Sequence, residues 1–86
     1  MNRISKTALL CLLTLSFGAL QAAPVNINQA PAEQIAENLS GIGEKKAQDI
    51  VKWRATNGPF KSADQLTEIK GIGPKTVEAN RKDIQL

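Results

Sequence analysis

The chain has 86 residues, 42% of them hydrophobic, and a formal net charge of +3, with one cysteine and neither histidine nor tyrosine. This length allows one small domain and leaves no room for a second one. Without histidine the chain lacks the commonest general base and metal ligand, which makes a catalytic site hard to build and argues against an enzyme.

The first 22 residues have the layout of a secretory signal peptide. Arg3 and Lys6 precede an apolar stretch over residues 8–20, and small residues follow it, so cleavage is expected after residue 22 or 23. A retained membrane anchor is disfavoured, because polar residues and a glycine interrupt a stretch that would need about 20 apolar residues. Lipidation of Cys11 is also disfavoured, because this cysteine lies inside the apolar stretch rather than after it.

Loss of this leader changes the charge of the working protein. Two of the 11 basic residues leave and all 8 acidic residues stay, so residues 23–86 carry 9 basic against 8 acidic groups, a net charge of +1. No cysteine remains to form a disulfide in an oxidising exported compartment, so stability must come from an apolar core. Any bound anion must be held by local geometry and clustered lysines rather than by a global positive field.

The first half of the exported chain predicts two helices. Residues 25–28 alternate apolar and polar side chains and are expected to run extended. A helix should begin near Pro31, a residue suited to the first helical position, and end at Gly41, with an apolar stripe of Ile35, Ala36 and Leu39. A longer helix is expected over residues 44–56 before Asn57-Gly58-Pro59, and its inner side carries Ala47, Ile50, Val51 and Arg54.

The second half predicts two shorter helices. Residues 62–65 have the Ser-x-x-Gln form of a capping box, which predicts the start of a third helix with Ala63, Leu66 and Ile69 turned inward. A fourth helix should begin at Pro74, with Val77 and Ile84 facing the core. No segment predicts a paired strand. The expected fold is an all-α domain made of two helix-corner-helix units, residues 31–56 and 62–82.

An internal repeat relates these two units. Sliding the chain by 30 positions superposes six pairs of like residues, namely Leu39 on Ile69, Gly41 on Gly71, Ile42 on Ile72, Gly43 on Gly73, Lys45 on Lys75 and Ala47 on Val77. Neither unit alone could cover its own apolar face in water. We therefore expect a pseudo-two-fold four-helix domain with one shared core, the two Gly-Ile-Gly corners on one surface, and Ile42 and Ile72 as plugs between helices.

Gly-Ile-Gly between short helices is the signature of the helix-hairpin-helix motif. The segments at residues 25–28, 47–54, 57–60 and 70–76 resemble short exported proteins of the ComEA competence type, over essentially all of the chain after the leader. That family binds double-stranded DNA without sequence preference and draws it across the envelope in natural transformation. The resemblance implies a periplasmic DNA receptor with no small-molecule substrate, with an inner-membrane DNA-uptake channel as a further partner and self-association on DNA.

Both the corner chemistry and the resemblance predict contacts to phosphates. Glycine lets the backbone amides approach an anion closely, and neighbouring lysines add salt-sensitive contacts that read no sequence. The expected DNA-binding residues are Gly41, Gly43, Lys45, Lys46, Lys70, Gly71, Gly73, Lys75 and Thr76. In relatives the hairpins approach the minor groove and some hold a monovalent cation with hairpin carbonyls. Otherwise no cofactor or metal is expected.

The first corner departs from the family pattern. Relatives often have proline before the first Gly-Ile-Gly and an uncharged residue after it, whereas Ser40 and Glu44 stand there in this chain. The Glu44 carboxylate favours the start of its own helix but lies near the expected phosphate. The first hairpin is therefore expected to bind more weakly than the second.

Three other interpretations stay open at this point. A single Gly-x-Gly is more often a tight turn than an anion site. Related hairpin domains also serve as protein-interaction scaffolds, an alternative that the low net charge keeps alive, and as accessory domains of repair enzymes. The aspartates show no metal-ligand spacing, and Trp53 and Phe60 are expected to pack rather than to stack on bases.

Overall fold

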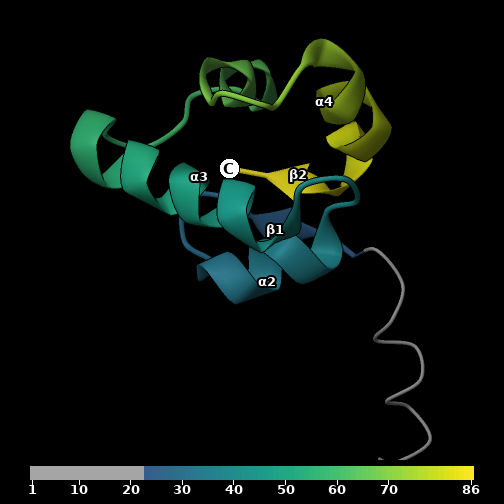
Figure 1. The fold of residues 1–86 in the computed structure, drawn as a ribbon, viewed down its shortest axis with the longest axis horizontal. Coiled ribbons are helices and arrows are strands. Elements are labelled where there is room, and N and C mark those ends of the chain that lie inside the picture. Colours follow the sequence, from purple (N-terminus) through teal and green to yellow (C-terminus); the bar gives the residue numbers. More distant parts are fainter. Residues whose placement is uncertain (1–22) are drawn as a thin grey trace, which may run out of the picture.

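The computed structural model describes residues 23–86, so the expected signal peptide, with Cys11, lies outside the described residues. The elements follow in the order β1 (Val25–Asn26), α2 (Ala32–Asn38), α3 (Gly43–Asn57), the 3₁₀-helix η2 (Ala63–Glu68), α4 (Pro74–Asn80), the 3₁₀-helix η3 (Arg81–Asp83) and β2 (Ile84–Gln85) (Figure 1). None of the helices in this part of the chain is both long and apolar enough to cross a membrane. The helix-rich fold expected from the sequence is confirmed.

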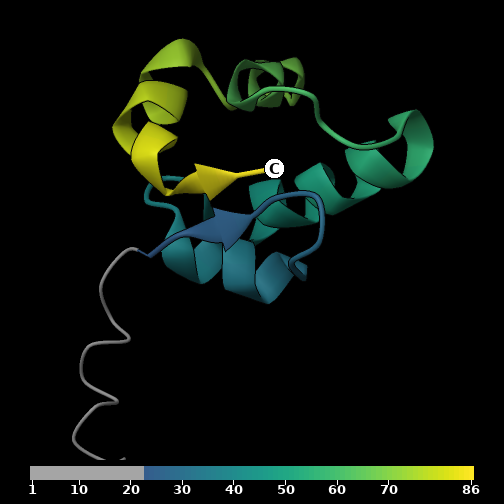
Figure 2. The same ribbon diagram turned by 180° about the vertical axis from the view of Figure 1, so that it is seen from behind.

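The expectation that no segment forms a paired strand is wrong. Val25 pairs with Ile84 and Asn26 with Gln85 in a two-stranded parallel sheet, and the Ile27 N–H extends it with a bond of 3.0 Å to the Gln85 carbonyl. Figures 1 and 2 show this pair between the layer of α2 and α3 and the layer of η2 and α4. The two strands therefore tie the beginning of the domain to its end.

In the first hairpin, α2 packs against α3 across a corner at residues 39–42. Pro31 lies just before the first helical residue, at the N-cap, and its carbonyl accepts bonds from Gln34 and Ile35. Helix α3 begins at Gly43 and buries Ala47 and Ile50. This inner face matches the helical spacing of the apolar residues. The sequence predicted the start of α2 and both ends of α3 within one residue, but α2 ends at Asn38, three residues before the expected Gly41.

In the second hairpin, the expected third helix is a 3₁₀-helix of six residues rather than an α-helix. The Ser62 side chain makes no capping bond, and the Gln65 side chain instead accepts a bond of 2.6 Å from the Lys61 N–H. The segment closes with bonds three residues apart, from Gln65 to Ser62 and from Ile69 to Leu66. Such bonds suit a short segment between fixed ends, so the capping-box pattern located the start of the element correctly but not its type or its bonding.

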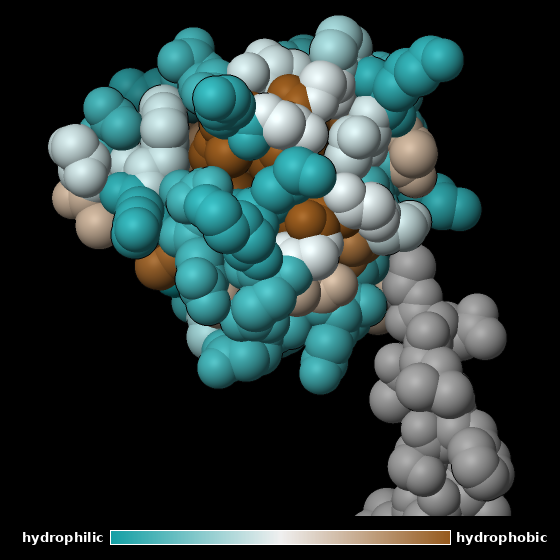
Figure 3. Space-filling model, viewed as in Figure 1, coloured by the Kyte–Doolittle hydropathy of each residue, from teal (hydrophilic) through white to brown (hydrophobic). Residues whose placement is uncertain are grey.

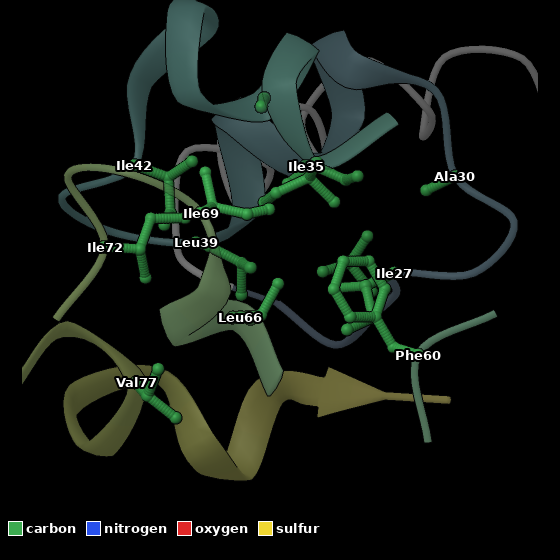
Figure 4. Close-up of a cluster of buried hydrophobic side chains, with 13 residues drawn as sticks. Ile27, Ala30, Ile35, Leu39, Ile42, Phe60, Leu66, Ile69, Ile72 and Val77 are labelled. Carbon is green, nitrogen blue, oxygen red and sulfur yellow. The ribbon is translucent and has the colours of Figure 1, made fainter. Parts of the chain in front are cut away.

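One apolar core joins both hairpins (Figure 4). Its buried members come from β1 and the turn after it, the four hairpin helices, both corners and the connector between the hairpins. They are Val25, Ile27, Ala30, Ile35, Leu39, Ile42, Ala47, Ile50, Phe60, Leu66, Ile69, Ile72 and Val77. Ile42 and Ile72 enter this cluster from their separate corners, each 4% exposed, as the plug expectation predicted. On the face shown in Figure 3 most of the surface is hydrophilic, and hydrophobic surface gathers in the seam between the halves.

Candidate nucleic-acid interface

The two Gly-Ile-Gly corners lie next to one another and contact the opposite hairpin in a reciprocal way. A Cβ placed on Gly41 would meet the Thr76 methyl group of α4 at 3.9 Å, and one placed on Gly71 would meet the Lys46 Cε of α3 at 2.7 Å. Gly41 and Gly71 are 30 residues apart, as are Lys46 and Thr76. Each contact is therefore the counterpart of the other, the pattern that a two-fold relation produces.

The two corners share their sequence but differ in backbone conformation. Gly41 and Gly71 match, with φ of +78° and +93°. Gly43 has φ of +71°, whereas Gly73 is extended, with φ of −103° and ψ of 176°. Pro74 follows Gly73 and pushes the preceding residue to extended conformations, while Glu44 places no such demand on Gly43. The corners thus direct their amides differently.

The predicted lysines lie around the corners and differ in their exposure and in their ion pairs. The Lys45 side chain is 85% exposed, and its Nζ lies 3.6 Å from Asp49 Oδ2. Lys70 and Lys75 are exposed, and no ion pair within residues 23–86 involves them or Lys46. Lys46 is half-buried and lies over the opposite corner, with its Nζ 3.8 Å from the position of a Cβ on Gly71. The second corner therefore receives a cation from the first hairpin.

The second corner also lacks the charge that compromises the first. Glu44 is exposed at the beginning of α3, and its carboxylate makes a long 3.5 Å contact with the Gln48 amide. The corresponding residue of the second hairpin is the uncharged Pro74. The Thr76 methyl group faces Gly41 across the junction of the two hairpins, and a methyl group has neither a charge nor a hydrogen-bond donor for an anion.

One residue that matters to the corners was missed by sequence reasoning. Asn80, at the end of α4, is 2% exposed, and its side chain binds both backbone groups of Ser40 and the Thr76 carbonyl. The signal was present in the sequence, because Asn80 continues the helical spacing of Val77 toward the core. A polar amide at a core-facing position should find buried partners.

Other polar and aromatic groups serve packing. Trp53 and Phe60 stack with ring centroids 4.3 Å apart and planes at 16°, and Phe60 is buried, so the two rings pack on one another, as expected. Arg81 pairs with Glu78 and with Asp64, and these hydrogen bonds raise the pKa of its guanidinium above the usual value. Its charge is therefore neutralised by two carboxylates.

The expectations for metals and cations concern the donor groups of residues 23–86. Residues 23–86 contain no group of three or more histidine, cysteine, aspartate or glutamate side chains arranged to hold a metal ion. The monovalent cation implied by the resemblance would use hairpin carbonyls. Of these, Ser40 O already accepts from Asn80 and Ile69 O from the Ile72 N–H.

Comparison with known proteins identifies the class. The family model described as the helix-hairpin-helix motif matches residues 21–85, and the chain belongs to this family. It is 47% identical over 66 residues to an uncharacterized protein of Haemophilus influenzae and 38% identical over 64 residues to ComE operon protein 1 of Bacillus subtilis, which confirms the ComEA-type resemblance.

These alignments cover most of this chain but less of its relatives. They include 77% of the chain and 59% of the Haemophilus protein, and 74% of the chain and 31% of the Bacillus protein. A shorter match, 42% identical over 53 residues, joins 62% of the chain to 8% of the mouse kinesin-like protein KIF22. The hairpin domain thus recurs within proteins of different size.

Proposed function

We propose that this protein binds double-stranded DNA without sequence preference, as a periplasmic receptor in DNA uptake. Family membership and the likeness to ComE operon protein 1 support this function. The single observation that carries it is the reciprocal contact of the two corners, Thr76 against Gly41 and Lys46 against Gly71, which brings the glycine corners and their lysines together. Backbone amides and lysines at fixed spacing suit the repeating phosphates of a duplex.

In this mechanism each corner holds a phosphate at its second glycine. The open surface at Gly43 and Gly73, where a Cβ would meet nothing within 4 Å, leaves room for a phosphate oxygen to approach. Lys46, Lys70 and Lys75 release counterions when they neutralise phosphates, so binding falls with salt. Because every base pair presents the same phosphates, these contacts position the protein without reading sequence.

The second corner is the stronger of the two in this proposal. It combines Lys70 and Lys75 with Lys46 from the opposite hairpin, and it has no carboxylate in the place of Glu44. The first corner keeps Lys45, whose charge is partly satisfied by Asp49. A duplex should therefore engage the second hairpin first.

The remaining parts of the proposal follow from the ComEA-type resemblance. Residues 1–22 act as a cleaved signal peptide and residues 23–86 as the exported DNA-binding domain. The family and its Bacillus relative point to a binding protein rather than an enzyme. An inner-membrane DNA-uptake channel would receive the DNA, and several copies would coat one duplex. No step depends on a cation at the hairpins.

A fluorescence anisotropy titration with two duplexes of unrelated sequence tests the function. We expect similar affinities, with a Kd of about 1–100 μM at physiological salt, and a linear fall of log affinity with log salt. Gly73→Val should weaken binding more than Lys52→Ala, because only the former places a side chain where a phosphate approaches.

Three results would count against the proposal. A strong preference for one duplex would show that the protein recognises bases rather than phosphates alone. Equal effects of Gly73→Val and Lys52→Ala would indicate diffuse charge attraction. Failure to bind any duplex at low salt would favour the protein-interaction scaffold, which the net charge of +1 over residues 23–86 also allows.

A further inference from the structure

Asn80 is the buried polar side chain of the described chain, and all its hydrogen-bonding groups are used near the first corner. Its Oδ1 accepts from the Ser40 N–H at 2.8 Å, and its Nδ2 donates to the Ser40 carbonyl at 2.8 Å and to the Thr76 carbonyl at 2.9 Å. Ser40 directly precedes Gly41, and the Thr76 methyl faces Gly41. One amide therefore holds both sides of the junction between the first corner and α4.

The two corners are closed by different means. In the second corner the Ile72 N–H bonds the Ile69 carbonyl at 3.0 Å, so the backbone closes its own turn. No corresponding bond joins Ile42 to Leu39 in residues 23–86. The first corner still forms a backbone turn over residues 40–42, and Asn80 on the opposite hairpin binds it in addition.

The internal repeat shows that this side-chain clamp exists at the first corner and not at the second. The 30-residue offset relates Asn80 to Ile50 and Ser40 to Lys70. Ile50 is fully buried and apolar, so it cannot offer the second corner the same bonds. The asparagine is thus an addition to the symmetric core, and its bonds to the backbone of the opposite hairpin serve the first corner alone.

We propose that Asn80 is a positioning residue that fixes the first corner relative to the second, so that both can engage one duplex together. This inference rests on the proposed function. Without the Asn80 amide, Ser40 and Gly41 would lose their link to α4, while Gly71 would keep its backbone turn. The first corner would then no longer be pre-aligned for a phosphate, although Asn80 itself touches no DNA.

Asn28 provides a matched control for this proposal. Its side chain also binds both backbone groups of one residue, with Nδ2 donating to the Phe60 carbonyl at 3.0 Å and Oδ1 accepting from the Phe60 N–H at 2.7 Å. This clamp holds the connector between the hairpins rather than a corner. Asn28→Ala and Asn80→Ala therefore remove the same kind of clamp at two different places.

The test compares the salt dependence of DNA affinity in folded Asn80→Ala, Asn28→Ala and unaltered protein. Asn80→Ala should lower the slope of log affinity against log salt by about 0.9, the loss of one phosphate contact, and weaken binding about fivefold at 0.15 M salt. Asn28→Ala should lower stability and leave the slope unchanged. A slope that Asn80→Ala leaves unchanged, or that both variants reduce equally, would overturn the positioning role.

A second variant and a second readout keep the proposal testable. If Asn80→Ala does not fold, Asn80→Asp replaces it, because the carboxylate still accepts from the Ser40 N–H but cannot donate to either carbonyl. Residual dipolar couplings measure the angle between α3 and α4 without DNA. If no duplex binds even the unaltered protein, the proposed function fails, and an angle unchanged in the Asn80 variant would show that positioning fails as well.

Discussion

The two hairpin corners carry the same three letters, Gly-Ile-Gly, and yet they are built differently. Gly43 lies in the left-handed region at φ +71°, while Gly73 is extended before Pro74. The first corner is held by the Asn80 amide, and the second by its own backbone turn. The comparison teaches that a repeated motif fixes which residues form a corner, whereas the residue after it and the neighbouring helix decide its geometry.

The largest expected effect tests what the corners have in common. Ile42→Ala and Ile72→Ala each remove a side chain that is 4% exposed in the shared core, so each should lower the free energy of unfolding by about 2–4 kcal/mol. Urea unfolding followed by circular dichroism measures both losses. A loss in only one of the two variants would show that the plugs are not equivalent.

The next prediction separates the two second glycines. Gly43→Ala should lower the free energy of unfolding by about 1–2 kcal/mol, because an alanine is strained at positive φ. Gly73→Ala should leave stability unchanged or raise it by about 0.5 kcal/mol, because the backbone is extended and a Cβ meets nothing. Equal losses in urea unfolding would contradict the different backbone conformations.

A third prediction concerns the lysines and depends on the proposed function. Lys75→Ala should weaken binding to every duplex about fivefold at 0.15 M salt and reduce the salt slope by about 0.9. Lys46→Ala should do the same, because its ammonium lies over Gly71. Lys52→Ala, on the exposed side of α3, is the control with little effect. Anisotropy titrations over a salt series, with two duplexes of unrelated sequence, measure the affinity and the salt slope. A sequence preference gained by a lysine variant would contradict the prediction, because phosphate contacts read no sequence.

The smallest effect tests the charge that distinguishes the first corner. Glu44→Gln should raise DNA affinity about twofold, because a carboxylate near a phosphate is removed. The same change should lower stability by about 0.3–1 kcal/mol, because a negative charge favours the start of α3.

Glu33 is a matched control for this last change. It is also an acidic residue in the first turn of a helix, α2, but it lies at the end of that helix farther from the corner. Glu33→Gln should cost similar stability and leave DNA affinity unchanged. If both variants gain affinity equally, net charge rather than the local carboxylate is responsible.

Much of the fold could be predicted from local patterns. Helical spacing of apolar residues located α2 and α3, and Pro74 marked the beginning of α4, because these signals act within one or two turns of the chain. The type of η2 could not be predicted in this way. Its capping-box letters are the same in an α-helix and a 3₁₀-helix, and the fixed ends of the segment decided between them.

The candidate site was predicted in part. The glycines and lysines of the corners could be named from the repeat, but not the partners across the junction, since Lys46 reaches Gly71 and Thr76 faces Gly41 only after the hairpins pack. Asn80 was missed because its bonds to Ser40 span 40 residues. Helical spacing places Asn80 on the inner face of α4 with Val77, but the backbone groups that its amide binds are set by the packing of the two hairpins.

The sequence by itself determined the two-unit plan of this protein: which residues turn, which enter the core, and that the two halves correspond at an offset of 30. These follow from side-chain size, backbone freedom and helical period, all local properties. Only the tertiary structure decided the parallel pairing of β1 with β2, the reciprocal contact of the corners and the Asn80 clamp. Each of these joins groups far apart in the chain, and such groups meet only once the shared core has formed.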